Sequence, residues 1–258
     1  MKIQIWKTLA RTVLLESARR KDIWVIVILG FLMICSASLL GVFGFQGLQS
    51  FVKDLTVNVL GLLSTIVAVV TACRVLPEEE KNRTLYPLLA RPISRFDLIM
   101  GKWLGAVLVS WVAFLSLSVV SCFGLLIFHV PLELLMLQYV IAKLMGLALI
   151  CAVGLCLSVY MTPAAATTLA FVLSFGTTMI TRAMTMAAST SPGGNKTGYQ
   201  LITAALPQFS LFDFGSRVAN TGWGLVPLWV FGVLAGYLAI YSSAMLYLSW
   251  AKFRRKAI

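Results

Sequence analysis

The chain has 258 residues, of which 60% are apolar and 12% are charged, and its formal net charge is +12. Soluble domains carry about twice that share of charged residues, so this chain has too few charges to cover a water-exposed surface. The composition excludes a soluble enzyme, a soluble nucleic-acid-binding domain and a disordered tail. It predicts an all-α polytopic membrane protein with a single transmembrane domain over residues 1–258, because each spanning helix needs about 20 apolar residues and six of them leave only loops and tails.

Residues 1–21 predict an amphipathic helix that lies in the cytoplasmic membrane interface. Its apolar face consists of Trp6, Leu9, Ala10, Val13, Leu14 and Ser17. Lys7 and Arg11 fall on the opposite face. The alternative is a plain basic N-terminus that only sets the orientation. The first span follows at about residues 23–43, an apolar run that is too long for the core of a cleaved signal peptide.

The segment between the second and third spans is the longest charged part of the chain. The second span covers about residues 55–76. Pro77 suits the first turn of a helix, and the three glutamates after it favour a positive helix N-terminus. We therefore expect a new short helix over residues 78–90, which Arg91-Pro92 ends.

Ser94 is expected to cap the next helix, with Asp97 in a position that resembles a capping box. This helix covers residues 95–128 and contains the third span, 103–128. Its length of about 50 Å exceeds the ~30 Å hydrocarbon core, so its first turns should project into the cytoplasm.

The second half of the chain predicts three more spans. The charge-free run 144–181 is too long for one span, and Thr162-Pro163 divides it. The expected segments are an outer loop at 129–140, spans at 141–161 and 163–181, an outer segment at 182–224 and a last span at 225–247. Within the outer segment, residues 201–215 indicate short helices that dip into the outer interface.

The basic residues follow the positive-inside rule if both termini are cytoplasmic. Of the 21 Lys and Arg residues, sixteen then lie in inner segments and five in outer segments. The positive charge therefore indicates orientation in a bilayer, and no nucleic-acid partner is needed to explain it.

The spans offer little catalytic chemistry. Arg74 and Lys143 are expected near span ends, where long side chains snorkel to water. His129 is the only histidine, and the chain has neither a GxSxG elbow nor a Walker A motif. The cysteines form no CxxC pair and are expected to be small buried hydrophobes. We therefore expect no enzyme activity, no metal site and no ATP bound by this chain itself.

A motif in residues 79–105 resembles the inner loop of permease subunits of ABC-type exporters, the class that includes drug and polysaccharide exporters. The matching residues are Glu79, Thr84, Leu88-Leu89, Pro92, Ser94-Arg95 and Gly101-Lys102. Arg83 replaces the more common glycine of that pattern. The stretch Leu206-Pro207-Gln208-Phe209 also resembles a branch associated with maturation of multicopper enzymes such as nitrous-oxide reductase.

The resemblance implies a permease that works in the bilayer as a homodimer or heterodimer, under separate ATPase subunits that hold ATP and Mg²⁺. Residues 77–102 would form the cytoplasmic coupling segment. The expected ATPase-coupling residues are Glu78, Glu79, Glu80, Arg83, Thr84, Leu88, Arg91 and Pro92. Arg95 and Lys102 would anchor the third span at the lipid headgroups.

The resulting hypothesis is an exporter permease in the plasma (inner) membrane, of bacterial type, with a hydrophobic or amphipathic cargo because the spans are poor in charge. One alternative is a membrane assembly or maturation factor that does not transport. A second is a secondary carrier, which the shortage of charged groups in the spans disfavours.

Overall fold

The computed structural model describes residues 2–19, 28, 30, 48–81, 94–127, 134–190, 207–219 and 224–255. The helices are α1 (Lys2–Arg19), α3 (Leu48–Lys81), α5 (Arg95–Ile127), α6 (Leu134–Tyr160), α7 (Pro163–Thr190), the 3-10 helix η2 (Phe209–Phe212), α9 (Gly215–Ala219) and α10 (Leu228–Arg255). All secondary structure in these ranges is helical, which confirms the all-α class. The expected first span, 23–43, lies outside the described residues apart from residues 28 and 30.

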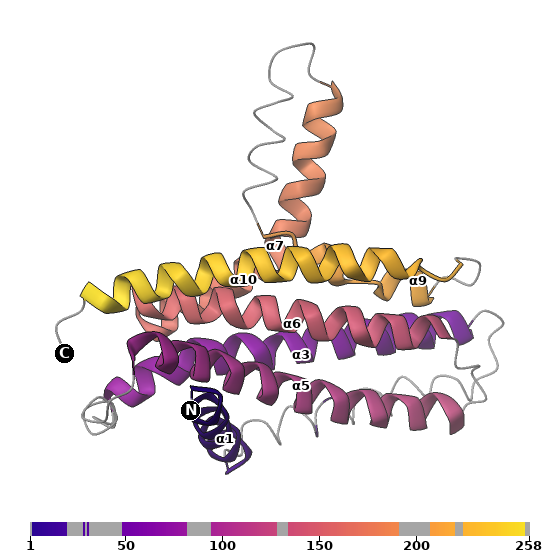
Figure 1. Ribbon diagram of the computed structural model, residues 1–258. Helices are drawn as coiled ribbons and strands as arrows, with labels where there is room; N and C mark the ends of the chain where they lie inside the picture. Colours follow the sequence, from indigo (N-terminus) through magenta and orange to yellow (C-terminus); the bar gives the residue numbers. More distant parts are fainter. Residues whose placement is uncertain are drawn as a thin grey trace.

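Helices α3, α5, α6 and α10 run side by side and form the bundle (Figure 1). These four are long and apolar enough to cross a membrane, as a polytopic membrane protein requires. Helix α6 lies at the centre, where nearly all its side chains from Gly146 to Cys156 are buried against α3, α5 and α10. The first part of α7, Pro163–Thr177, is apolar but shorter than the four spans. The C-terminal part of α7 stands away from the bundle (Figure 1).

Three predicted boundaries are wrong. The second span was expected from about residue 55, but α3 begins at Leu48. We expected a new helix after Pro77, but α3 continues through this proline to Lys81. The proline removes one helical hydrogen bond near the end of a well-packed helix, a loss that packing against neighbouring helices can offset. We also expected a loop up to residue 140, but α6 begins at Leu134. The other described helices begin within about three residues of the expected positions, including the turn at Thr162-Pro163.

Helix α1 crosses α5 with the face that the sequence predicts. Leu9, Ala10, Val13 and Ser17 are buried, whereas Lys7 is exposed. The close approach depends on two glycines of α5. A Cβ atom at Gly101 would lie 2.7 Å from Leu9 Cβ, and one at Gly105 would lie 2.7 Å from Val13 Cβ. Helix α1 is therefore fitted into a groove in α5.

The two ends of the bundle differ in composition. At one end meet the last turn of α3, the first turns of α5, the α6–α7 turn and the last turns of α10 (Figure 1, left). We call it the charged end, because Glu78–Lys81, Arg95 and Arg254 lie there. The short helices η2 and α9 lie toward the opposite end, packed on α3 and α6. This packing agrees with the predicted short helices over residues 201–215, as far as that segment is described.

Candidate functional site

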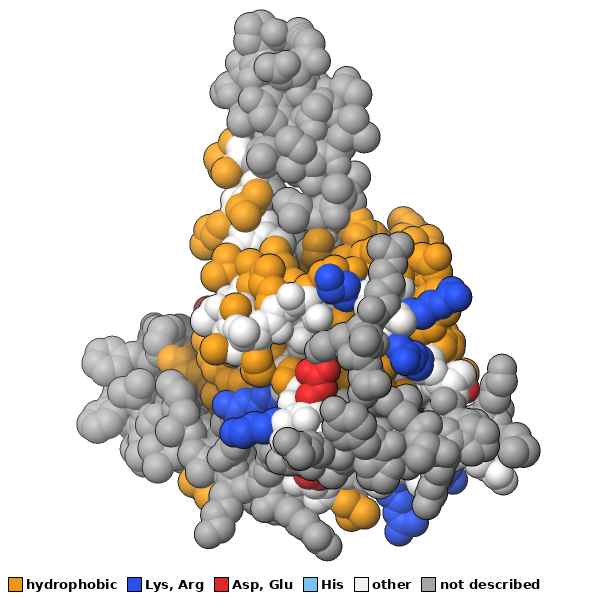
Figure 2. All heavy atoms as spheres, turned by 90° about the vertical axis from the view of Figure 1, so that its left-hand side faces the viewer, with side chains coloured by type: hydrophobic (Ala, Val, Ile, Leu, Met, Phe, Trp, Pro, Cys, Tyr) orange, Lys and Arg blue, Asp and Glu red, His pale blue; other side chains and the backbone are white. Residues whose placement is uncertain are grey.

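The charged end contains those of the expected site residues that the structure describes. Figure 2 looks onto this end, where Lys and Arg side chains surround a small acidic patch. Glu78, Glu79 and Glu80 form the end of α3, and Arg95 and Lys102 lie on the first turns of α5. Arg83, Thr84, Leu88, Arg91 and Pro92 lie outside the described residues.

At this end an ion pair joins Glu79 Oε1 to Lys102 Nζ. Lys102 is 2% exposed and Glu79 is 15% exposed, so the pair is shielded from water. The pair joins the end of α3 to the beginning of α5, on the two sides of residues 82–93. Removing one partner of a buried pair leaves an uncompensated charge, so the contact should hold these two helices together.

Lys102 does not reach the lipid headgroups as we expected, because its ammonium group points to Glu79 inside the bundle. Arg95 also points to the protein. Its Nη1 donates hydrogen bonds to the carbonyl oxygens of Phe253 (3.1 Å) and Arg254 (3.0 Å). These carbonyls belong to the last turn of α10, whose oxygens lack helical partners. Both cations therefore connect helices to one another.

The start of α5 is capped as the sequence predicts. The backbone N–H of Asp97 donates to Ser94 Oγ (3.1 Å), and Ser94 Oγ donates to Asp97 Oδ2. Asp97 also accepts a hydrogen bond from the indole Nε1 of Trp6 (2.9 Å). The capping carboxylate thus fixes α1 and α5 to each other, a role that the sequence pattern did not indicate.

A hollow of about 720 Å³ opens beside Glu80. Its other walls are Pro77, the α6–α7 turn from Ser158 to Pro163, and Lys252 of α10. The ammonium group of Lys252 lies 5.6 Å from the centre of the Tyr160 ring. Glu80 is exposed, whereas Glu79 is engaged with Lys102. Of these two glutamates, Glu80 is therefore the exposed one that lines the hollow.

Polar contacts connect the helices at the charged end to one another. Ion pairs and hydrogen bonds join α3 to α5, α5 to α1, and α5 to α10. Segment 82–93 leaves this connected group of helices and returns to it. The helices on both sides of the segment are therefore tied into one connected group.

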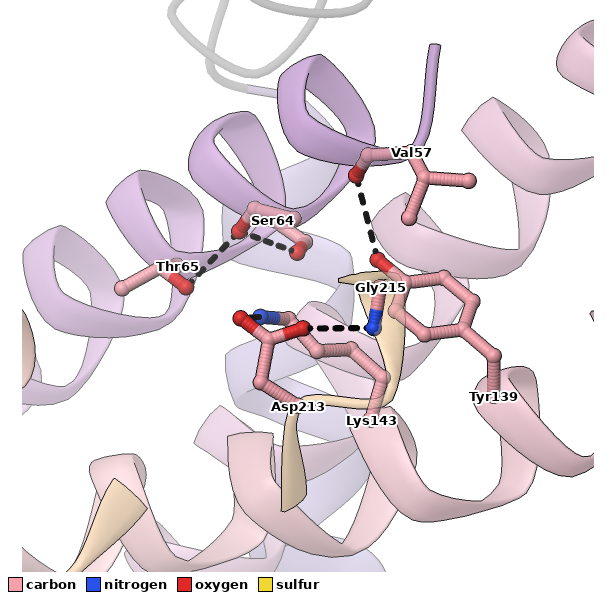
Figure 3. A network of polar contacts seen from close by, with 8 residues as sticks. Val57, Ser64, Thr65, Tyr139, Lys143, Asp213 and Gly215 are labelled. Atoms are coloured by element: carbon pink, nitrogen blue, oxygen red, sulfur yellow. Dashed lines mark hydrogen bonds and ion pairs between the residues drawn. The ribbon is translucent and has the colours of Figure 1, made fainter. Parts of the chain in front are cut away.

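A second polar cluster, which the sequence did not indicate, is shown from close by in Figure 3. It lies near the beginning of α6, away from the charged end. Lys143 of α6 was expected near a span end with its ammonium group in water. Instead the side chain is buried, and Nζ lies 4.0 Å from Asp213 Oδ2, just after η2. Tyr139 donates a hydrogen bond to the Val57 carbonyl (3.2 Å) beside it. The available signal was a lysine within an apolar helix, a pattern that by default indicates function.

Comparison with known proteins gives a match along almost the whole chain. The model of one protein family, described as "ABC-2 family transporter protein", matches residues 8–256. No curated protein matches the chain.

Proposed function

The chain belongs to the ABC-2 family of transporter proteins, and from this premise we propose that it is the permease subunit of an ATP-driven exporter. A separate ATPase subunit would hold ATP and Mg²⁺ and would dock at the charged end. The chain would pair with a second permease, either another copy or a relative. The family description names no branch, so the resemblance to multicopper-enzyme maturation permeases stays a prediction.

The ion pair between Glu79 and Lys102 is the observation that supports this proposal most strongly. It ties together the two helices that flank segment 82–93, which carries Thr84, Leu88-Leu89 and Pro92 of the exporter-like motif. When the ATPase subunits close, a force on this segment would reach α3 and α5 as one unit. The contacts of α5 with α1 and α10 would carry the force further into the bundle.

Glu80 is the proposed contact with the ATPase at this end. It is exposed and lines the hollow formed with the α6–α7 turn. A basic side chain of the ATPase that enters this hollow would meet the Glu80 carboxylate, whereas the Tyr160 ring already lies beside Lys252. The rest of the proposed contact consists of Arg83, Thr84, Leu88, Arg91 and Pro92, which lie outside the described residues.

The proposed cargo is hydrophobic or amphipathic. Buried charges are few in the described spans, and the core is made mostly of aliphatic and small side chains. An aqueous ion path would need more polar lining. The pathway would run between two permeases, as the resemblance implies.

The docking proposal is tested with Glu80→Lys in the complex with the ATPase subunit that copurifies with this chain. We expect about tenfold weaker association and a matching loss of cargo-stimulated ATP hydrolysis, the scale of a lost interfacial charge pair. Glu16→Lys is the matched control, because Glu16 is an exposed glutamate on α1. Normal assembly of the Glu80→Lys complex would overturn the docking site, and cargo movement without ATP would support a secondary carrier.

A further inference from the structure

A pocket of about 290 Å³ lies between α3, α6, α7 and η2, beside the Lys143 cluster. Apolar side chains make most of its wall, among them Phe175, Met179 and Phe209. Its charged lining residues are Lys143 and Asp213. Mostly apolar walls with a few convergent polar groups are typical of sites for small ligands.

The ammonium group of Lys143 is poorly matched within the protein. The residue is 9% exposed, and its nearest anion, Asp213 Oδ2, lies 4.0 Å away, beyond hydrogen-bond distance. In the part of the chain that the structure describes, Nζ donates no hydrogen bond, although an ammonium group has three N–H donors. Burying a cation without hydrogen-bonded acceptors is costly. An anion bound in the pocket would therefore stabilise the buried ammonium group of Lys143.

We propose that this pocket binds the anionic head of an amphiphile, a phosphate or carboxylate, with Lys143 as its cationic contact. The inference rests on the proposed transport function, and it names the chemical class of the cargo.

Asp213 balances the charge of Lys143 only in part, because one of its carboxylate oxygens faces Nζ at 4.0 Å and the other is bound elsewhere. Its Oδ1 accepts a hydrogen bond from the Gly215 backbone N–H (3.1 Å), and the side chain is 55% exposed (Figure 3). The positive charge is thus the buried one of the two. A ligand anion could come closer to Nζ than Asp213 does and would replace it as the partner.

Two hydroxyl groups of the pocket favour a ligand head that carries a proton as well as a negative charge. Thr65 donates its proton to the Gly61 carbonyl (2.8 Å), and Ser174 donates to the Ala170 carbonyl (2.7 Å). Their oxygens can only accept from a ligand. An anionic head that also carries a hydroxyl proton, such as a monohydrogen phosphate, would satisfy both kinds of group.

The walls of the pocket favour an attached apolar tail. Met179 is 70% exposed and Phe175 is 47% exposed, so the side of the pocket formed by α7 opens toward the surroundings of the bundle. A volume of about 290 Å³ holds a head group and a few methylenes, and a longer chain could leave past these two residues into lipid.

Two glycines allow close packing around the pocket. A Cβ atom at Gly61 would lie 3.2 Å from Lys143 Nζ, so the missing side chain leaves room for the ammonium group. A Cβ atom at Gly146 would lie 2.8 Å from Phe212 Cβ, so this glycine lets η2 approach α6. The absence of a side chain at both positions thus lets the segments that line the pocket approach one another closely.

The test measures binding to the full chain in nanodiscs of zwitterionic lipid, without ATP or ATPase. The probe is a decyl phosphate with a diazirine in its chain, and the competitors are decyl phosphate, decanol and inorganic phosphate. We expect decyl phosphate to compete best, and Lys143→Gln to weaken it about tenfold, the scale of a charge-assisted hydrogen bond. Lys143→Arg should retain binding. Asp213→Asn should bind severalfold more tightly, because it removes the competing charge and keeps an acceptor for Gly215 N–H.

Lys7→Gln is the control, because it removes one exposed charge from α1, away from the pocket. Equal competition by decanol, or unchanged binding in both Lys143→Gln and Asp213→Asn, would overturn the proposal. Equal competition by inorganic phosphate would also overturn it, because an amphiphile should then bind no better than its head alone. The outcome is independent of the docking test, since it needs neither ATP nor the ATPase.

Discussion

At the residue scale, the acidic cluster at the end of α3 divides into two roles. The sequence indicated that Glu78–Glu80 are functional, but it gave no sign that one of them serves the chain itself. Glu79 is paired with Lys102, whereas Glu80 is exposed beside the hollow. Residues 79 and 102 are separated by segment 82–93 and pair only because α3 continues past Pro77. Because we expected the helix to end at this proline, the sequence could not predict the pair.

The first prediction concerns the Glu79–Lys102 pair. Lys102→Met should lower the free energy of unfolding by about 3 kcal/mol, because it removes the cationic partner of a largely buried ion pair. The double variant Glu79→Gln/Lys102→Met should recover part of this loss. The measurement is the thermal unfolding of the purified chain in one detergent. Equal melting temperatures for the single and double variants would show that the two charges do not depend on each other.

Lys143 shows the limit of sequence reasoning at the same scale. Its position on α6 follows from the hydropathy pattern, but the direction of its side chain depends on Gly61 of α3 and Asp213 after η2. Both lie at least 70 residues away in the sequence. A long lysine side chain can snorkel outward or turn inward, and only the packing of three distant segments decides between them.

At the element scale, the amphipathic pattern of α1 correctly predicted its buried face. It could not identify α5 as the surface against which that face packs. The complementary signal is the Gly101-x-x-x-Gly105 spacing, which permits close approach of two helices. The hydrogen bond from Trp6 to Asp97 adds a fixed point near the same crossing. Together these contacts make α1 part of the bundle.

The second prediction tests this crossing with Gly105→Leu. The new side chain would collide with Val13, since even a Cβ atom would lie 2.7 Å from Val13 Cβ. Helix α1 should leave its groove, and trypsin should cut after Lys7 and Arg11 several times faster. The ATP-coupled activity should fall as well, because α1 belongs to the connected group at the charged end.

Gly236→Leu is the matched control for this experiment. Gly236 lies within α10, and a Cβ atom there would meet no atom within 4 Å. The same substitution should therefore leave both the cleavage rate of α1 and the coupling unchanged. If Gly105→Leu were cleaved no faster than this control, α1 would not depend on the groove in α5.

At the scale of the whole molecule, the distribution of charge follows from the order of the helices. Four chain segments that are far apart in the sequence bring basic residues to the charged end, including Arg95, Lys102 and Lys252. The hydropathy pattern predicted this clustering, because an even number of membrane crossings separates the basic segments from one another and so places them on the same side. It also placed Glu78–Glu80 among basic residues, but it could not predict the pairing of Glu79 with Lys102.

The last prediction concerns orientation in the membrane. The charged end should face the cytoplasm, because anionic lipids and the positive-inside rule favour Lys and Arg there. Gly224 lies just before α10 and Lys252 lies in its last turns, and both are exposed. In a cysteine-free background, Gly224→Cys should react with a membrane-impermeant maleimide in intact cells. Lys252→Cys should react only after the membrane is opened, because the length of α10 separates the two positions. A reporter at Asn195 should agree with Gly224, and labelling of both cysteines from one side would mean that α10 does not cross the bilayer.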